Sequence, residues 1–395
     1  MDETAAVTAF LERPDGRVLL LRRADQASTY PGRWAGVSGY LENGDALAQA
    51  YHELEEETGL KEADVELAGT GPPVVAADEE GRWVVHPFLF RTGDAAEIRL
   101  NEESAESEWV EPAALAERET VPALADAYLL ARFGDRVKAV AENRLLGAGA
   151  LAAQCVGTLA EAAELGLFPL TLGRAFAGAR PAMGAIAGAV GRVLASARTP
   201  EQVVWEAQAM LSAHERARRS IAVLVQPYIQ GTVMTHSASA TVREALLHAP
   251  PGRVVCTASE PGGEGRAFAE ELQAAGLTAE LVSDEDAERA VTTVDVFLVG
   301  ADTVFRDGSL ANKTGTSTLA EAATRAGIPV IVACETTKLA PFEAQEPEED
   351  IFDLTRVEFV GRYVTDEGEF PAGEIHTLVD RLPFLRDGYA VLSGE

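Results

Sequence analysis

The sequence contains little lysine, little cysteine and few aromatic residues. Lysine and arginine number 33 together, and four of these are lysine (Lys61, Lys138, Lys313, Lys338). No basic stripe is visible along the chain, so we expect no nucleic-acid partner. The three cysteines, Cys155, Cys256 and Cys334, are far apart and show no CxxC spacing. This spacing predicts reduced, structural thiols and no zinc site.

Long hydrophobic runs are also missing. The most apolar region, residues 145–170, is interrupted by Glu161 and Glu164, which is typical of a buried helix and not of a membrane span. The first ten residues, MDETAAVTAF, lack the basic start and apolar core of a signal peptide. We therefore expect a cytoplasmic protein without a membrane partner.

Acidic residues are abundant and spread over the whole chain. The formal net charge is −30, from 63 acidic and 33 basic residues. Residues 1–120 contribute −16 (26 acidic, 10 basic), and the remainder contributes −14 (37 acidic, 23 basic). A broadly acidic surface with arginine in place of lysine fits a salt-filled cytoplasm, where ions screen the repulsion between like charges. We interpret it as a halophilic adaptation.

The pattern of elements predicts an α/β protein with three segments. Residues 4–12 and 17–23 form a strand–turn–strand pattern, and residues 46–58 form a helix with Gly59 as its C-terminal cap. Residues 123–219 are rich in alanine at helical spacing. From residue 229, strands and helices alternate, which indicates a parallel sheet covered by helices on both faces. We predict domains at residues 1–120, 121–226 and 227–395.

Residues 39–60, GYLENGDALAQAYHELEEETGL, carry the first candidate site. On a helix, Glu53, Glu56 and Glu57 share one face, where three like charges repel unless a cation lies between them. A hard divalent cation, Mg²⁺ or Mn²⁺, suits such carboxylates. A solvated acidic helix face would explain the charge equally well. The glycines at both ends favour the metal site.

This stretch resembles the Nudix box, in which a glycine and a glutamate precede the pattern REUxEExGU, with U an aliphatic residue. Asp45 stands at the first glutamate, His52 replaces the arginine, and six residues instead of seven separate these two positions. The resemblance implies an α/β/α sandwich and a metal-dependent hydrolase of a nucleoside diphosphate linked to another moiety. It also implies metal ligands and catalytic residues at Glu53, Glu56 and Glu57, assisted by Asp45.

Polar residues at successive strand ends form the second candidate site. Carboxyl ends of parallel strands meet at one edge of a sheet, where ligands bind. Lys313 supplies a positive charge there, and Gly315-Thr316 opens a helix whose first N–H groups can hold a phosphate. The segments are Thr235–Ser239, Ser259–Pro261, Gly300–Asp302, Asn312–Thr316 and Glu335–Lys338.

Residues 122–395 resemble the family that groups translation initiation factor 2B alpha, beta and delta subunits with ribose-1,5-bisphosphate and methylthioribose-1-phosphate isomerases. The matching residues include Arg180-Pro181, GTVMTHSASATV, CTASEPGGEGR, VGADTVFRDGSLANKTGT and CETTKL. The resemblance implies a helical part followed by a Rossmann-like domain, and a homodimer or higher homo-oligomer formed through the latter. It further implies an isomerase-like catalytic Asp302 and a small phosphorylated metabolite or nucleotide bound by Arg180, Ser237, Ser239, Asn312, Lys313, Gly315 and Thr316.

Two substitutions argue against isomerase chemistry. Ser237 stands where the sugar isomerases carry a cysteine, and a serine hydroxyl titrates far above neutral pH. Glu260 replaces the arginine usual before that proline. We favour a Nudix-type hydrolase. The alternatives are a non-catalytic regulatory or translation-factor-like binding protein, and an aldose–ketose isomerase that uses Asp302 without the cysteine.

Overall fold

The computed structural model describes residues 3–94 and 96–394. Contacts between residues divide the chain into two compact units. The first unit comprises residues 1–141, 158–175 and 199–204, and the second comprises residues 142–157, 176–198 and 205–395. Within the described part of the chain, no helix is both long and apolar enough to cross a membrane. The three cysteines are free and buried.

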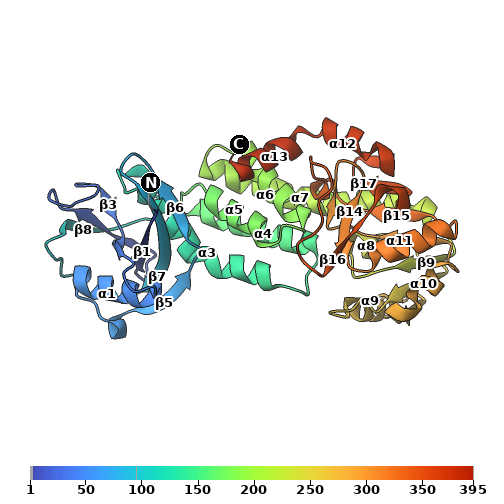
Figure 1. Ribbon diagram of the computed structural model, residues 1–395, viewed down its shortest axis with the longest axis horizontal. Helices are drawn as coiled ribbons and strands as arrows, with labels where there is room; N and C mark the ends of the chain where they lie inside the picture. The colour runs from blue at the N-terminus through green and yellow to red at the C-terminus, as the bar shows by residue number, and fades with distance from the viewer. Residues whose placement is uncertain (1–2, 95, 395) are drawn as a thin grey trace. The chain divides into compact units, whose positions relative to one another are not determined.

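The first unit is built on an eight-stranded mixed sheet (Figure 1). Its central strands β1 and β7 pair in parallel over ten residues, from Glu3 opposite Arg82 to Glu12 opposite Arg91. The strands and helices are β1 (Glu3–Glu12), β2 (Val18–Arg23), β3 (Trp34–Ala35), β4 (Val37–Tyr40), α1 (Ala46–Thr58), β5 (Glu66–Thr70), β6 (Val74–Ala77), β7 (Arg82–Arg91), β8 (Ser104–Val110), α2 (Ala114–Glu117) and α3 (Leu124–Glu142).

Helices cover both faces of this sheet. Val7 and Leu11 of β1 belong to the hydrophobic core that includes Leu54 of α1. Because side chains alternate along a strand, Phe10 points to the opposite face, where its ring lies 5.3 Å from that of Tyr128 on α3. The predicted α/β/α sandwich is confirmed.

Helices dominate the middle of the chain, as the alanine-rich spacing predicts. They are α3, α4 (Ala148–Glu164), α5 (Leu170–Ala179), α6 (Gly184–Ser196) and α7 (Pro200–Val225).

Small residues allow close contact between elements of the second unit. A Cβ atom at Gly188 of α6 would lie 2.0 Å from the carbonyl oxygen of Thr337, so only glycine fits there.

The second unit contains the predicted parallel sheet, in the order β11-β10-β9-β12-β15-β17-β18. Its first six strands are parallel, and β18 pairs antiparallel at the edge. The strands are β9 (Thr232–Thr235), β10 (Arg253–Thr257), β11 (Ala279–Val282), β12 (Val296–Val299), β15 (Val330–Ala333), β17 (Arg362–Thr365) and β18 (Gly368–Pro371). This strand order is that of a Rossmann-type sheet. The order reverses between the adjacent strands β9 and β12, which is the topological switch point.

Helices also cover both faces of the second sheet. Met234 and Phe297 belong to one core with Leu319 of α11, while their neighbours Val233 and Leu298 belong to another with Val242 of α8. The helices are α8 (Ala240–His248), α9 (Glu264–Ala274), α10 (Asp284–Val291), α11 (Thr316–Arg325), α12 (Ile375–Arg381) and α13 (Pro383–Ser393). A small sheet of β13 (Thr303–Val304), β14 (Leu310–Lys313) and β16 (Phe352–Thr355) completes the unit.

Candidate functional site

Helix α1 occupies the residues that the sequence predicts, from Ala46 to Thr58. The backbone N–H of Ala48 donates to the carboxylate of Asp45 at 3.1 Å, which makes Asp45 the N-cap. Gly59 takes a left-handed conformation (φ 75°) and closes the helix, as predicted. Asp45 is exposed and serves as a cap in this structure. Its assignment as a metal ligand stays a prediction.

Glu57 is the most buried of the box carboxylates, with 6% of its surface exposed. The backbone N–H of Ser38 donates to its Oε1 at 2.8 Å. Burial raises the pKa of Glu57 to about 8, although the Ser38 hydrogen bond lowers it, and the charges of Glu53 and Glu103 raise it further. Burial and neighbouring negative charge therefore outweigh the hydrogen bond that favours the ionised form.

Glu53 lies against the glycine that opens the box. A Cβ atom at Gly39 would stand 1.8 Å from Oε1 of Glu53, so no other residue fits at position 39 without moving the carboxylate. The side chain of Gln49 donates to the same Oε1 at 2.7 Å. Burial also raises the pKa of Glu53, as does the charge of Glu56. Gly39 and Gln49 therefore hold Glu53 in place.

Glu56 is exposed, unlike its two partners. Its Oε2 lies 3.5 Å from Nε2 of His52, one helical turn earlier. The two side chains form an ion pair only when the histidine is protonated. His52 thus contacts Glu56, the exposed glutamate at the rim of the site. Glu57 has a different partner, the backbone N–H of Ser38.

Two residues that the sequence did not single out act on these carboxylates. The charge of Glu103 raises the pKa of both Glu53 and Glu57, and the charge of Arg23 lowers that of Glu57. Arg23 is held by Thr29, whose carbonyl oxygen accepts from its Nε at 2.8 Å. Neither residue lies in the box. A segment distant in sequence gives no spacing signal, so only the fold reveals them.

The donor set suits a hard divalent cation. The charge of Glu53 raises the pKa of Glu57, an effect that a bound cation would offset, and carboxylate oxygens are the ligands that Mg²⁺ and Mn²⁺ prefer. In residues 3–94 and 96–394, however, no three His, Cys, Asp or Glu side chains converge as a closed metal site. The residues that would hold a cation are Glu53 and Glu57, with Glu56 and Glu103 nearby.

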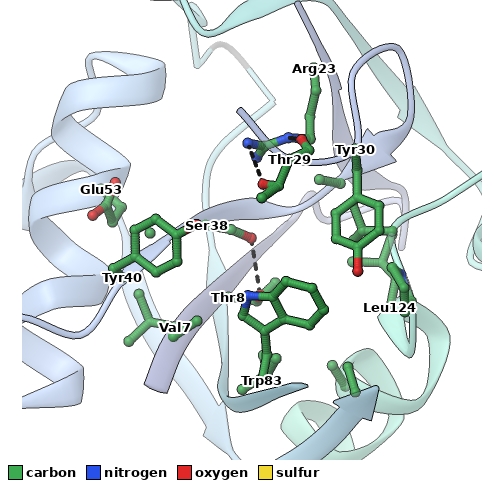
Figure 2. A pocket seen from close by; sticks show the side chains of 18 of the residues that line it. Val7, Thr8, Arg23, Thr29, Tyr30, Ser38, Tyr40, Glu53, Trp83 and Leu124 are labelled. Carbon is green, nitrogen blue, oxygen red and sulfur yellow. Dashed lines mark hydrogen bonds between the residues drawn. The ribbon is translucent and has the colours of Figure 1, made fainter. Parts of the chain in front are cut away.

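Glu53, Glu56 and Glu103 line a cavity of about 280 Å³ (Figure 2). Figure 2 shows Glu53 and Tyr40 on one side, and Trp83, Tyr30 and Leu124 on the other. Between them, the hydroxyls of Thr8 and Ser38 lie 3.0 Å apart. The lining residues also include Arg23, Thr29, Glu42, Glu56, Val85, Glu103, Val121, Pro122, Ala123 and Ala127.

The aromatic wall of this cavity is held in place by hydrogen bonds and ring contacts. The hydroxyl of Tyr30 donates to the carboxylate of Asp78 at 2.9 Å, and its ring centroid lies 5.4 Å from that of Trp83. Tyr30 has a positive φ of 51°, which is uncommon for a bulky residue. Ala123, on the wall formed by the segment before α3, also has a positive φ, of 59°. Strained backbone of this kind often gathers at functional sites.

The second site lies at the carboxyl edge of the parallel sheet. Ser237 follows β9 and donates from its hydroxyl to Oε1 of Glu264 at 3.0 Å. Lys313, at the end of β14, lies 3.0 Å from the same oxygen. Its Nζ also donates to the carbonyl oxygen of Pro261 at 2.6 Å. Ser239 caps α8 and lies close to Gly300, where a Cβ atom would meet its Oγ at 2.5 Å.

The N-terminus of α11 has a partner within the chain. The backbone N–H of Gly315 donates to Asp353 at 2.7 Å, and that of Ser317 donates to the same carboxylate at 3.2 Å. The side chain of Asn312 donates to Thr316 at 3.1 Å. The helix terminus that the sequence assigns to a phosphate therefore holds a carboxylate of the protein itself.

Comparisons with known proteins match both units. A NUDIX domain family model matches residues 2–133, and the model of the Initiation factor 2 subunit family matches residues 171–360. Over 189 residues the chain is 32% identical to a putative translation initiation factor eIF-2B subunit 2-like protein of Pyrococcus abyssi, covering 42% of this chain and 68% of that relative. The chain belongs to the initiation factor 2 subunit family. A NUDIX domain forms its N-terminal part. Both resemblances inferred from the sequence are confirmed.

Other relatives of the initiation factor 2 domain are named as enzymes. The chain is 29% identical to the ribose 1,5-bisphosphate isomerase of Archaeoglobus fulgidus over 225 residues, covering 49% of this chain and 71% of the relative. It is 33% identical to that of Haloferax volcanii over 181 residues, covering 38% and 56%. A solved structure of the translation initiation factor eIF-2B from Pyrococcus horikoshii OT3 has a TM-score of 0.54 at 24% identity, covering 60% of this chain and 96% of that one. This last likeness shows the fold.

Asp302 of the initiation factor 2 domain lies among buried charges. Burial raises its pKa to about 6, while the charges of Lys338 and Arg180 lower it. Arg180 is 1% exposed and pairs with Glu349 at 2.8 Å, but its Nη2 has no hydrogen-bond partner in the structure. Lys338 lies 3.4 Å from Glu335. An unsatisfied buried donor beside a titratable carboxyl favours a ligand site.

Proposed function

We propose that the NUDIX domain hydrolyses the diphosphate bond of a nucleoside diphosphate linked to another moiety. One observation supports this above the others: Glu53 and Glu56 line a cavity of about 280 Å³, and the charge of Glu53 raises the pKa of the buried Glu57 on the same helix. Two desolvated carboxylates are costly to keep without a cation. The cavity provides room for a small ligand next to them.

Each residue of the NUDIX site would have a defined role. Glu53 and Glu57 would hold Mg²⁺ or Mn²⁺, with Glu56 and Glu103 at the rim and Asp45 as a further candidate. When bound, the cation lowers the pKa of water and neutralises charge on the diphosphate. The oxygen of water would bond to one phosphorus as the bridging P–O bond breaks, leaving two phosphate monoesters and a released proton. Gly39 and Gln49 orient Glu53, and Ser38 orients Glu57.

The cavity wall opposite the glutamates favours an aromatic base in the substrate. Trp83 and Tyr30 present their rings there, and Leu124 adds apolar surface (Figure 2). Aromatic rings bind nucleobases by stacking, which tolerates any base with a π face. A nucleotide with its base at Trp83 and its diphosphate toward Glu53 would span the cavity.

The test is hydrolysis of a panel of nucleoside diphosphate sugars and dinucleoside diphosphates with Mg²⁺. We expect Glu57→Gln to lower kcat/KM at least a hundredfold, because the amide cannot replace an anionic ligand. The matched control is Glu55→Gln, since Glu55 is exposed on the same helix and pairs with Lys61 at 3.9 Å. Equal rates for wild type and Glu57→Gln would remove the metal assignment.

For the initiation factor 2 domain we propose ligand binding without isomerase activity. The hydroxyl of Ser237 donates to Glu264, which Lys313 neutralises, so the serine has no free base nearby to make it a proton shuttle. Asp302, Arg180, Ser239 and Asn312 would then serve recognition, and the domain would form the homo-oligomer. Incubation with ribose 1,5-bisphosphate should give no ribulose 1,5-bisphosphate. Its appearance would support the isomerase alternative.

A further inference from the structure

Glu264 occupies a position in the second unit that is built to attract an anion. The hydroxyl of Ser237 and the ammonium group of Lys313 approach it from two different strand ends, and both reach Oε1 at 3.0 Å. Lys313 also reaches Oε2, at 3.3 Å. Glu264 itself is the first residue of α9, where the helix dipole favours negative charge. Lys313, Ser237 and the N-terminus of α9 therefore all interact with one carboxylate, that of Glu264. The anion at this position belongs to the chain itself.

The surroundings make this contact stable. The side chain of Lys313 is 10% exposed and that of Glu264 is 21% exposed, so solvent screens the pair weakly. The loop that carries Ser237 is fixed as well, because its backbone N–H donates to the hydroxyl of Ser259 at 2.8 Å. Ser237 and Ser259 both have positive φ values, of 66° and 61°. The surrounding contacts hold a strained backbone in the form that meets Glu264.

We propose that Glu264 determines the specificity of this site by excluding phosphate groups from the Lys313 position. A phosphate would need to displace the carboxylate from its two partners or to lie beside it as a like charge. Both alternatives weaken binding. A ligand group that reaches this position must be neutral or cationic, such as a hydroxyl or an amine.

The N-terminus of α11, the neighbouring position that could bind an anion, also holds a carboxylate of the chain. Asp353 accepts from the backbone N–H groups of Gly315 and Ser317, so these two groups at the start of α11 have a partner within the chain. Glu260, in the loop that carries Pro261, adds a further negative charge and lies 3.5 Å from Arg266. The surroundings of Lys313 thus contain three acidic side chains, from α9, β16 and the loop before α9. This arrangement does not depend on the hydrolase activity proposed for the NUDIX domain.

The experiment measures binding of inorganic phosphate and ribose 5-phosphate to the full chain by isothermal titration calorimetry, with EDTA to exclude metal-dependent binding. We expect wild type to bind both weakly and Glu264→Gln to bind them at least tenfold more tightly. Lys313 is required for this gain, so the double variant Glu264→Gln/Lys313→Met should return to the wild-type affinity. Glu264→Ser provides a second neutral variant if the glutamine variant is unstable.

Two control variants distinguish the loss of the Glu264–Lys313 contact from the loss of one negative charge anywhere near the site. Glu270→Gln removes the same charge from an exposed position on α9, and Glu260→Gln removes it from the adjacent loop. Neither should gain as much affinity as Glu264→Gln. The proposal is overturned if wild type binds phosphate as tightly as Glu264→Gln, if either control gains equally, or if the double variant keeps the gain.

Discussion

Gly39 of strand β4 and Glu53 of helix α1 are in direct contact within the NUDIX box. A Cβ atom at position 39 would lie 1.8 Å from Oε1 and 2.1 Å from the carboxyl carbon of Glu53. The carboxylate therefore occupies the space that any other residue would fill with its side chain. The glycine at the start of the box is required by this contact, since its backbone shows no positive φ.

We predict that Gly39→Ala lowers hydrolase activity by about tenfold or more, because a displaced Glu53 cannot hold the cation in the same place. The measurement is kcat/KM for the best substrate of the panel with Mg²⁺. Gly93→Ala is the matched control, since a Cβ atom there would meet nothing within 4 Å. If Gly39→Ala lost no more activity than Gly93→Ala, the contact between Gly39 and Glu53 would have no role in catalysis.

The aromatic wall gives a second prediction. Trp83→Ala should raise KM for nucleotide substrates by about 5- to 150-fold, the equivalent of 1–3 kcal/mol of base stacking. The value of kcat should change little, because Trp83 lies across the cavity from Glu53 (Figure 2). Trp205→Ala is the control, as Trp205 is 66% exposed in the second unit. An unchanged KM in Trp83→Ala would place the base elsewhere.

Asp353 gives a pH-dependent prediction. Burial raises its pKa to about 6, although the N–H groups of Gly315 and Ser317 lower it. Because this folded-state pKa lies above the ordinary value near 3.9, the contribution of Asp353 to stability is complete below about pH 4 and is lost as pH rises through about 6. Asp353→Asn does not titrate. The stability of wild type relative to Asp353→Asn should therefore fall by about 1–3 kcal/mol between pH 4 and pH 7.

Melting temperatures of wild type and Asp353→Asn at fixed KCl, measured at pH 4, 5, 6 and 7, test this sign. The control is Asp350→Asn, because Asp350 is exposed three residues earlier. A relative stability that rises with pH would mean that the hydrogen bonds to Asp353 outweigh its burial.

The net charge of −30 gives a fourth prediction. Raising KCl from about 0.1 M to 1 M shortens the screening length from about 10 Å to about 3 Å, which weakens repulsion between exposed acidic residues. The melting temperature should rise over this range. Sucrose at equal osmolarity is the control, since it leaves charges unscreened. A flat or falling melting temperature in KCl would contradict the halophilic interpretation.

Features that depend on local spacing could be predicted from the amino-acid sequence alone. Helix α1 begins and ends where the pattern predicts, because Asp45 and Gly59 cap it through contacts within four residues. The two families were also readable from the chain, since their motifs are contiguous. The strand–helix alternation after residue 229 was enough to predict a parallel sheet, because each crossover requires a helix.

Which of these residues can act together depends on the folded arrangement of the chain. Glu56 and Glu57 are neighbours in sequence, but packing of α1 on the sheet buries Glu57 and leaves Glu56 exposed. Glu103 and Arg23 act on Glu57 from distant segments. In the second unit, the fold brings Glu264 onto Lys313, at a position that the sequence assigns to a phosphate. Burial and long-range charge depend on which surfaces pack together in three dimensions. The spacing of residues along the chain does not show which surfaces these are.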